Sequence, residues 1–323
     1  MSIVNGIIQP HLPMIINNKL NASKYIKFNL DIFTIANNAH VNVNKFNNEM
    51  LHSIYDNINN MITYLQPYAN ILFICNDLYG YGGSATNCNI LQNFFSHTHN
   101  THTIYIADYI NPRAIFATLV FRPDIVILKS FVNINLKKFF KVPLLYFVGG
   151  IFMDNLNKPL STINVPEYIN PFVINQIKYA DITFANSIHT AKLLKNACSL
   201  NIYVFFSTFV QYYGTFIINN HGYNRRYKYG IIISNFKRQI KNALHSINKI
   251  KDYANKSILI GKNSSMFKEY GFTCTGLLSH KDTIKYLSHI DEVIIDSHFE
   301  SCSNVYVESV FNGCRVQIID YGI

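Results

Sequence analysis

The stretch IIDSHFESCSNVYVESVFNGCRV, Ile294–Val316, carries the pattern from which the fold is deduced. An apolar strand comes first, followed by a polar loop, a short helix, a glycine and a second apolar strand. Glu300 lies in the loop at the exit of the first strand, and Glu308 lies inside the helix. Because ligands of open α/β sheets bind outside the carboxyl ends of the strands, both carboxylates are predicted to face one crevice.

This pair of acids admits three interpretations. In the first, Glu308 is an exposed helix residue and Glu300 is a favourable charge near the helix N-terminus. In the second, the two carboxylates accept hydrogen bonds from the hydroxyls of a sugar and a ribose. In the third, they act as acid and base in glycoside hydrolysis. The pair alone does not choose among them.

The sequence before this stretch alternates between short apolar runs and helical patterns, which is typical of βαβ units with a parallel sheet. The strands predicted in the first half are 70–75, 103–107, 124–128, 144–148, 182–185 and 202–206. The helices predicted there are 84–95, 112–120, 169–179 and 187–197. In the second half the predicted strands are 229–233, 257–260, 272–274, 292–295 and 315–319, and the predicted helices are 241–253, 281–288 and 305–311.

A segment rich in Gly and Asn, 212–228, interrupts this alternation and is predicted to join two α/β domains with a cleft between them. The first domain is expected to span 68–215 and the second 216–323. Residues 1–67 are expected to form an N-terminal extension packed on the first domain.

Composition and length agree with two globular domains, since 49% of the 323 residues are hydrophobic. The six cysteines lack metal-ligand spacing and are interpreted as free, mostly buried thiols of a reducing compartment. The start of the chain lacks the pattern of a signal peptide, and the apolar segment 142–153 is too short to span a bilayer. A cytoplasmic location is therefore expected.

The net charge of +10 fits several partners: nucleic acid, a phosphate-bearing small ligand, an anionic membrane surface, or none, as a solvated positive face. The basic residues are scattered, so nucleic acid ranks last and is not an expected partner. The one local cluster is 224–228, followed by Lys237, Arg238 and Lys241. His97, His99 and His102 alternate in a linker and are interpreted as surface residues.

Two loops are candidates for holding an anion. In the turn 79–83, Gly82 and Gly83 precede a helix, so the backbone could approach a phosphate at the helix N-terminus. The turn is not GxGxxG, and a tight turn without a ligand is the alternative. In the second half, Arg238 and Lys241 follow a strand and could grip a diphosphate, with a solvated basic loop as the alternative.

Taken in order, these segments resemble the retaining GT-B glycosyltransferases called group 1, or family 4. DSHFESCSNVYVE, residues 296–308, resembles the family signature P-S-x-x-E-x7-E, and FNGCRV, residues 311–316, resembles the Ala-Cys-Gly-Cys-Pro-Val that often follows it. Further segments that resemble family strands and turns are 122–126, 142–145, 181–187, 258–261 and 272–276. The resemblance covers residues 69–323.

The resemblance implies a GT-B fold, with two Rossmann-like parallel-sheet domains facing a central cleft. It implies retaining transfer of a hexose-like sugar from a UDP- or GDP-type nucleotide sugar, bound mainly to the second domain. The acceptor, whose hydroxyl receives the sugar, would be a glycan, a lipid or a protein and would bind mainly to the first domain. The basic net charge also allows a peripheral contact with an anionic membrane. No metal or other cofactor is expected.

Matching positions imply individual roles. Glu300 would be the catalytic residue on the donor sugar, and Glu308 would hold the ribose hydroxyls. Arg238 and Lys241 would stabilise the charge of the leaving diphosphate. The remaining donor-binding residues would be Gly82 and Gly83 in the first domain and Ser301, Cys302, Ser303 and Asn304 beside the sugar.

The chain departs from the family pattern in several places. Asp296 replaces the usual proline, and Ser301 and Ser303 replace the usual glycines. Gly149–Gly150 occupies the place where the family often has a histidine, so no acceptor-side catalytic residue is predicted. The family's crossing C-terminal helix has no counterpart before Ile323, so a truncated second domain is expected. The rival hypothesis is a catalytically degenerate GT-B module that binds a nucleotide or a partner without transfer.

Overall fold

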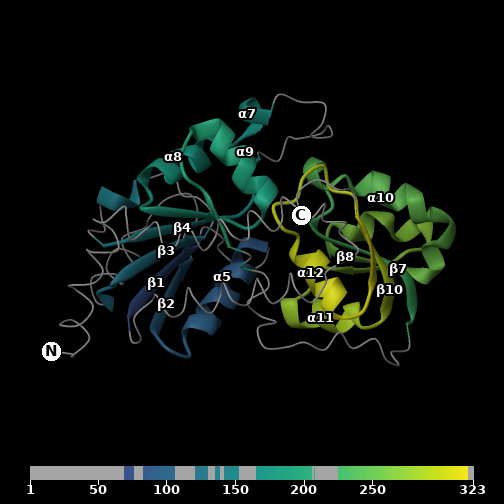
Figure 1. Ribbon diagram of the computed structural model, residues 1–323. Coiled ribbons are helices and arrows are strands. Elements are labelled where there is room, and N and C mark those ends of the chain that lie inside the picture. The colour runs from purple at the N-terminus through teal and green to yellow at the C-terminus, as the bar shows by residue number, and fades with distance from the viewer. Residues whose placement is uncertain are drawn as a thin grey trace. The chain divides into compact units, whose positions relative to one another are not determined.

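The computed structural model describes residues 69–75, 83–105, 121–129, 135–138, 142–152, 165–205, 207 and 225–318. These residues form two compact α/β units, each built on a parallel sheet (Figure 1). Phe152 and the described residues 165–168 group with the second unit. The predicted extension 1–67, the glycines of the turn 79–82 and the predicted helix 112–120 lie outside the described residues.

The first sheet has the strand order β2-β1-β3-β4-β5-β6, with every neighbouring pair parallel. Its strands are β1 (Asn70–Cys75), β2 (Asn100–Tyr105), β3 (Ile125–Lys129), β4 (Leu144–Val148), β5 (Ile182–Ala185) and β6 (Tyr203–Val204). Every residue of β3, β4 and β5 is buried, as expected for apolar runs covered on both faces of a sheet. The predictions for β1, β4 and β5 are confirmed to the residue, whereas β6 is shorter than predicted.

Side chains cap the N-termini of two helices in the first unit. The helices of the first unit are α5 (Gly83–Phe95), α8 (Pro171–Tyr179) and α9 (Ile188–Cys198), with a 3-10 turn, η1 (Leu136–Lys138), whereas α7 (Val165–Tyr168) belongs to the second unit. Asn170 caps α8 by accepting a hydrogen bond from the backbone N–H of Phe172, so this helix starts two residues later than predicted. Ser187 caps α9 through the N–H of Thr190. None of the described helices is long and apolar enough to cross a membrane.

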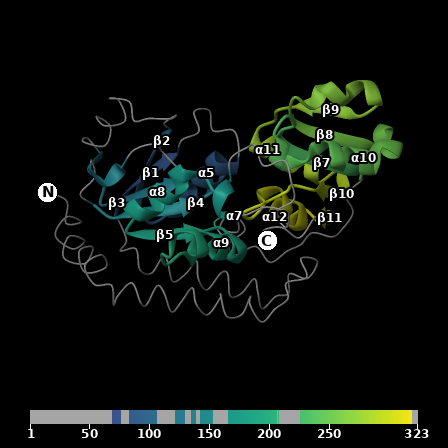
Figure 2. The same cartoon turned by 90° about the horizontal axis from the view of Figure 1, so that it is seen from above.

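The second sheet is also parallel, with the order β11-β10-β7-β8-β9 (Figure 2). Its strands are β7 (Tyr227–Asn235), β8 (Ser257–Lys262), β9 (Thr273–Gly276), β10 (Ile290–Ile295) and β11 (Arg315–Ile318). Gly261 in β8 has φ +142°, and a Cβ there would lie 1.6 Å from the carbonyl oxygen of Ile233. Glycine is therefore the residue that lets β8 approach the end of β7 so closely.

The predicted helix 241–253 is wrong as a single element. The chain forms a 3-10 turn, η4 (Gln239–Lys241), then α10 (Ala243–Ile250), then a second 3-10 segment, η5 (Lys251–Lys256). Asn242 breaks the pattern because its backbone is left-handed, at φ 48°. Ala243, Ile247 and Ile250 of α10 still share one face and pack into the core beneath the sheet.

The helices that complete the second unit are η6 (Ser264–Tyr270), α11 (His280–Leu287) and α12 (Asn304–Phe311). α11 and α12 pack against each other, and Figure 1 shows them on one side of the sheet with α10 on the other. Both begin within one residue of their predicted starts. Ser279 caps α11 and Ser303 caps α12, each by accepting a backbone N–H hydrogen bond.

Arg225 joins the far ends of these two helices. Its Nη1 donates to the carbonyl oxygens of Leu287, Ser288 and Ile290 at 3.1, 3.1 and 2.8 Å. Its Nη2 donates to the carbonyl oxygens of Asn312 and Gly313 at 3.1 and 2.9 Å. A guanidinium suits this place because helix C-termini carry unpaired carbonyls and partial negative charge. The sequence cluster 224–228 thus contains an internal structural cation.

Replacing Arg225 with Lys is expected to lower the free energy of unfolding by roughly 3 kcal/mol, because one ammonium cannot reach both groups of carbonyls. Urea unfolding of the purified chain measures the change. Arg226→Lys, at the exposed neighbouring position, is the matched control and should change stability by about 0.5 kcal/mol or less. Equal stabilities of the two variants would contradict the structural role of Arg225.

His99 is buried, so its interpretation as a surface residue is wrong; His97 and His102 are exposed. Its ring lies 5.9 Å from that of Phe95, between centroids, and neither ring nitrogen has a hydrogen-bond partner in the described part of the chain. Burial lowers the pKa of His99 from its ordinary value to about 4. The folded state therefore favours the neutral imidazole.

This burial makes stability depend on pH. Since the folded pKa lies below the unfolded one, the contribution of His99 is present above about pH 6.5 and is lost as pH falls toward 4. His99→Leu should remove about 1–3 kcal/mol of the stability loss measured by urea unfolding between pH 7 and pH 4.5. His97→Leu should keep the wild-type pH dependence. Identical pH dependence in wild type and His99→Leu would show that His99 does not cause it.

Candidate functional site

Two loops of the second unit leave the same edge of its sheet. β7 and β10 are parallel neighbours, so the segment after Asn235 and the segment after Ile295 both start at the carboxyl edge. The first contains the basic loop, and the second contains the polar loop that leads into α12. The backbone N–H of His298 donates to the carbonyl oxygen of Ile240 at 2.8 Å, which ties the two loops together.

Lys241 and Glu300 meet between these loops. Lys241 Nζ lies 2.5 Å from Glu300 Oε1, and both side chains are largely buried, at 20% and 14% exposure. The hydroxyl of Ser297 donates to the same Oε1 at 2.6 Å. The sequence predicted Lys241 and Glu300 in one site. It did not predict Ser297, whose hydroxyl orients the carboxylate of Glu300. Arg238 is half-buried in the same loop, and its Nη1 lies 3.5 Å from the hydroxyl of Ser234.

The residues after Glu300 lead into the N-terminus of α12. Ser303 caps the helix by accepting from the N–H of Tyr306 at 3.3 Å, and the first turn contains no acid. Backbone N–H groups at such an end favour an anion. Cys302 is buried and has φ 145°, an unusual backbone for a residue with a side chain. Ser301, Cys302, Ser303 and Asn304 thus form the approach to a helix end that suits a phosphate.

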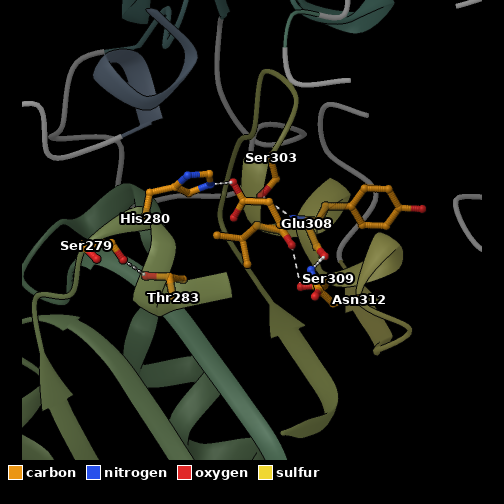
Figure 3. A network of polar contacts seen from close by, with 9 residues as sticks. Ser279, His280, Thr283, Ser303, Glu308, Ser309 and Asn312 are labelled. Atoms are coloured by element: carbon orange, nitrogen blue, oxygen red, sulfur yellow. Dashed lines mark hydrogen bonds and ion pairs between the residues drawn. The ribbon is translucent and has the colours of Figure 1, made fainter. Parts of the chain in front are cut away.

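Glu308 is buried, and this rules out its interpretation as an exposed helix residue. Its side chain is 4% exposed, and its Oε1 lies 2.8 Å from Nε2 of His280, the first residue of α11 (Figure 3). The hydrogen bond to Glu308 raises the pKa of His280, whereas burial opposes the shift. The pair thus holds an imidazole against a buried carboxyl group.

Local hydrogen bonds place both members of this pair. The hydroxyl of Ser279 accepts from the N–H of Asp282 at 3.1 Å, and the hydroxyl of Thr283 donates to the carbonyl of Ser279 at 3.0 Å, which fixes the start of α11. At the other member, Asn312 donates through Nδ2 to the carbonyl oxygen of Glu308 at 2.7 Å. Figure 3 shows the side chains of His280 and Glu308 pointing toward one another from the two helices.

Asp296, which replaces the usual proline of the signature, is a buried carboxylate at the end of β10. Lys249 Nζ lies 2.7 Å from its Oδ1, and His245 Nδ1 lies 3.3 Å from its Oδ2. Both partners come from α10, where their i, i+4 spacing puts them on one face. The i, i+4 spacing of His245 and Lys249 is a sequence signal that could have predicted a carboxylate partner for them. The contacts attach α10 to the loop that carries Glu300.

In the first unit, Lys129 is a charged residue at the carboxyl edge of the sheet. It is fully buried at the end of β3, and its Nζ lies 3.2 Å from Asn186 Oδ1 and 3.4 Å from Ser207 Oγ. Its buried hydrogen bonds therefore connect β3 to the segments that follow β5 and β6. Gly83 is exposed as the first residue of α5, and Gly82 lies outside the described residues. Within the described ranges, no group of three or more His, Cys, Asp or Glu residues could hold a metal ion.

Comparison with known proteins identifies the architecture. No family model matches the sequence, and no curated protein sequence matches it. Solved structures do. HepE from Anabaena, in complex with UDP and glucose, is 13% identical with a TM-score of 0.54 over 79% of this chain and 82% of that one. Sucrose-phosphate synthase from Thermosynechococcus elongatus is 12% identical with a TM-score of 0.53, over 79% and 82%.

A third solved structure agrees with these two. AviGT4, a glycosyltransferase involved in avilamycin A biosynthesis, is 11% identical with a TM-score of 0.50 over 79% of each chain. At such identities the likeness concerns the arrangement of the backbone. The two parallel-sheet units and these structural neighbours confirm the predicted fold class: the chain has the GT-B fold.

Proposed function

We propose that the chain is a glycosyltransferase that moves a hexose-like sugar from a UDP- or GDP-type nucleotide sugar to a hydroxyl acceptor, with retention of configuration. One observation carries the proposal. At the carboxyl edge of the second sheet, the cation Lys241 contacts the acid Glu300, directly before a helix end suited to a phosphate. A GT-B fold and the double-Glu signature that the chain resembles add support.

The roles follow from charge and position. Breaking the bond between the sugar and the diphosphate places negative charge on the leaving phosphate oxygens. Lys241 and the amide groups at the N-terminus of α12 would stabilise that charge, with Arg238 as a second cation in the loop. Glu300 would accept hydrogen bonds from the sugar hydroxyls while Ser297 keeps its carboxylate in place. Because cations and amides suffice for the diphosphate, the proposal includes no metal.

Glu308 has a separate role in this proposal. Its carboxylate is held on α12, beyond the helix end, and would accept hydrogen bonds from the ribose hydroxyls. A buried acceptor in a polar network discriminates strongly between a ligand that satisfies it and one that does not. Nucleotide sugars therefore bind to the second unit, whereas the acceptor, whether glycan, lipid or protein, binds to the first.

A second candidate function is binding without transfer. Ser301 and Ser303 place side chains where the family that the chain resembles has glycines, and these side chains would narrow the space beside a donor sugar. Lys241 and Glu300 also neutralise each other at 2.5 Å. A degenerate GT-B module with these features would hold a nucleotide and leave the sugar attached.

Glu308→Ala is expected to weaken binding of the preferred nucleotide sugar by about tenfold or more, since hydrogen bonds to a charged group are lost. A thermal-shift panel of UDP- and GDP-sugars first identifies that ligand, and isothermal titration then gives the Kd. Glu292→Ala is the matched control, because Glu292 lies on β10 and pairs with Arg315. Unchanged affinity in Glu308→Ala would sink the assignment of Glu308.

Transfer and mere binding are separated by the fate of the sugar. Incubation of the protein with the tightest-binding nucleotide sugar should release the free nucleotide diphosphate, by transfer when an acceptor hydroxyl is present and by slow hydrolysis in water. Lys241→Met should reduce this release by about a hundredfold. Tight binding with no nucleotide diphosphate released over a long incubation would establish the binding module instead.

A further inference from the structure

The two oxygens of the Glu308 carboxylate have different surroundings. Oε1 lies 2.8 Å from Nε2 of His280. Among the described residues, His280 is the source of the hydrogen bond to this side chain. The carboxylate keeps the lone pairs of Oε2 and one lone pair of Oε1 for a further donor. The carboxylate is thus fixed through Oε1, while Oε2 can accept a hydrogen bond from a ligand.

His280 reaches this carboxylate from a fixed position. It is the first residue of α11, directly after the cap Ser279, so its backbone is set by the capped first turn. Its side chain is 37% exposed, compared with 4% for that of Glu308. The charged neighbours on its own helix are Lys281 and Asp282, and from the packed helix α12 the group that faces it is Glu308. The imidazole is thus partly open to solvent, whereas the acid is buried.

We propose that His280 is a positioning residue that aims the Glu308 carboxylate at the 2′,3′-diol of a ribonucleotide donor and so makes the site prefer ribonucleotides to deoxyribonucleotides; this rests on the proposed function. A diol presents two O–H donors, and an ionised carboxylate offers acceptors to both. A glutamate has three rotatable bonds, and a hydrogen bond that selects one rotamer before the ligand arrives reduces the entropy lost on binding. His280 supplies that hydrogen bond.

The proposed role of His280 concerns the ribose diol alone. It can therefore be distinguished from a purely structural role. A contact that merely holds α11 against α12 would affect every nucleotide alike. A contact that aims Glu308 affects the ligands that carry the 2′-hydroxyl. The informative quantity is therefore the ratio of the Kd of a 2′-deoxynucleotide to that of the ribonucleotide.

The experiment titrates the full chain with UDP and 2′-deoxy-UDP, and in parallel with GDP and 2′-deoxy-GDP, by calorimetry. Wild type should bind the ribonucleotide about tenfold more tightly than its 2′-deoxy form. In His280→Leu the ratio should fall to about twofold or less, because the carboxylate loses its orienting donor. His280→Gln, whose amide can still donate to Oε1, should restore most of it. His289→Leu, an exposed histidine beyond the other end of α11, is the matched control and should keep the wild-type ratio.

The outcomes separate the two proposals. If His280→Leu weakens both nucleotides equally, or leaves both unchanged while Glu308→Ala abolishes the ratio, the positioning role is overturned and the proposed function stands. If wild type binds none of the four nucleotides, the proposed function fails and the present inference fails with it. Thermal unfolding of each variant checks folding, and His280→Gln provides the answer if His280→Leu does not fold.

Discussion

Parallel pairing of β10 with β7 is the constraint on which the candidate site depends. Two strands that run side by side in the same direction send their following loops out at the same edge. Lys241 follows one strand and Glu300 follows the other, so a cation and an acid 59 positions apart in sequence become an ion pair. Ser297 and the contact between His298 and Ile240 then fix the geometry of the meeting point.

The opposite ends of α11 and α12 show how the scaffold holds the site. Arg225 binds the carbonyls that follow α11 and those at the end of α12, so one planar cation satisfies groups that neither helix can pair internally. With these ends fixed, the helices stay packed and His280 faces Glu308. Arg225 thus joins the two helices at their C-terminal ends, and the hydrogen bond between His280 and Glu308 joins them nearer the start of α11.

The burial of Glu308 decides against one interpretation that the sequence left open. A carboxylate at 4% exposure, paired with His280, is not a surface charge, so the first interpretation of Glu308 is wrong. Asp296 shows the same principle, because its buried carboxylate is accompanied by Lys249 and His245. Each of the two buried acids that the structure describes in this unit therefore has a basic side chain beside it.

The sequence by itself determined the elements whose signals are local. Continuous apolar runs predicted β1, β4 and β5 with the bounds that the structure has, because burial on both faces needs an unbroken run. The alternation of apolar runs and helical patterns predicted the starts of α9, α11 and α12 to within a residue. The resemblance of residues 296–308 to a family signature predicted Glu300 and Glu308 as site residues, and these roles stay predictions. These patterns depend on neighbours along the chain.

Tertiary structure alone decided which distant groups meet. The sequence around Arg225 does not predict its hydrogen bonds to the carbonyls of Leu287 and Gly313. The sequence around His280 does not predict its hydrogen bond to Glu308. The left-handed backbone of Asn242 and the burial of His99 were missed for the same reason. A side chain's partner is set by strand order and helix packing, which bring residues tens of positions apart within hydrogen-bond distance. Local periodicity predicts only that a residue faces the interior. The tertiary packing determines which residues it contacts there.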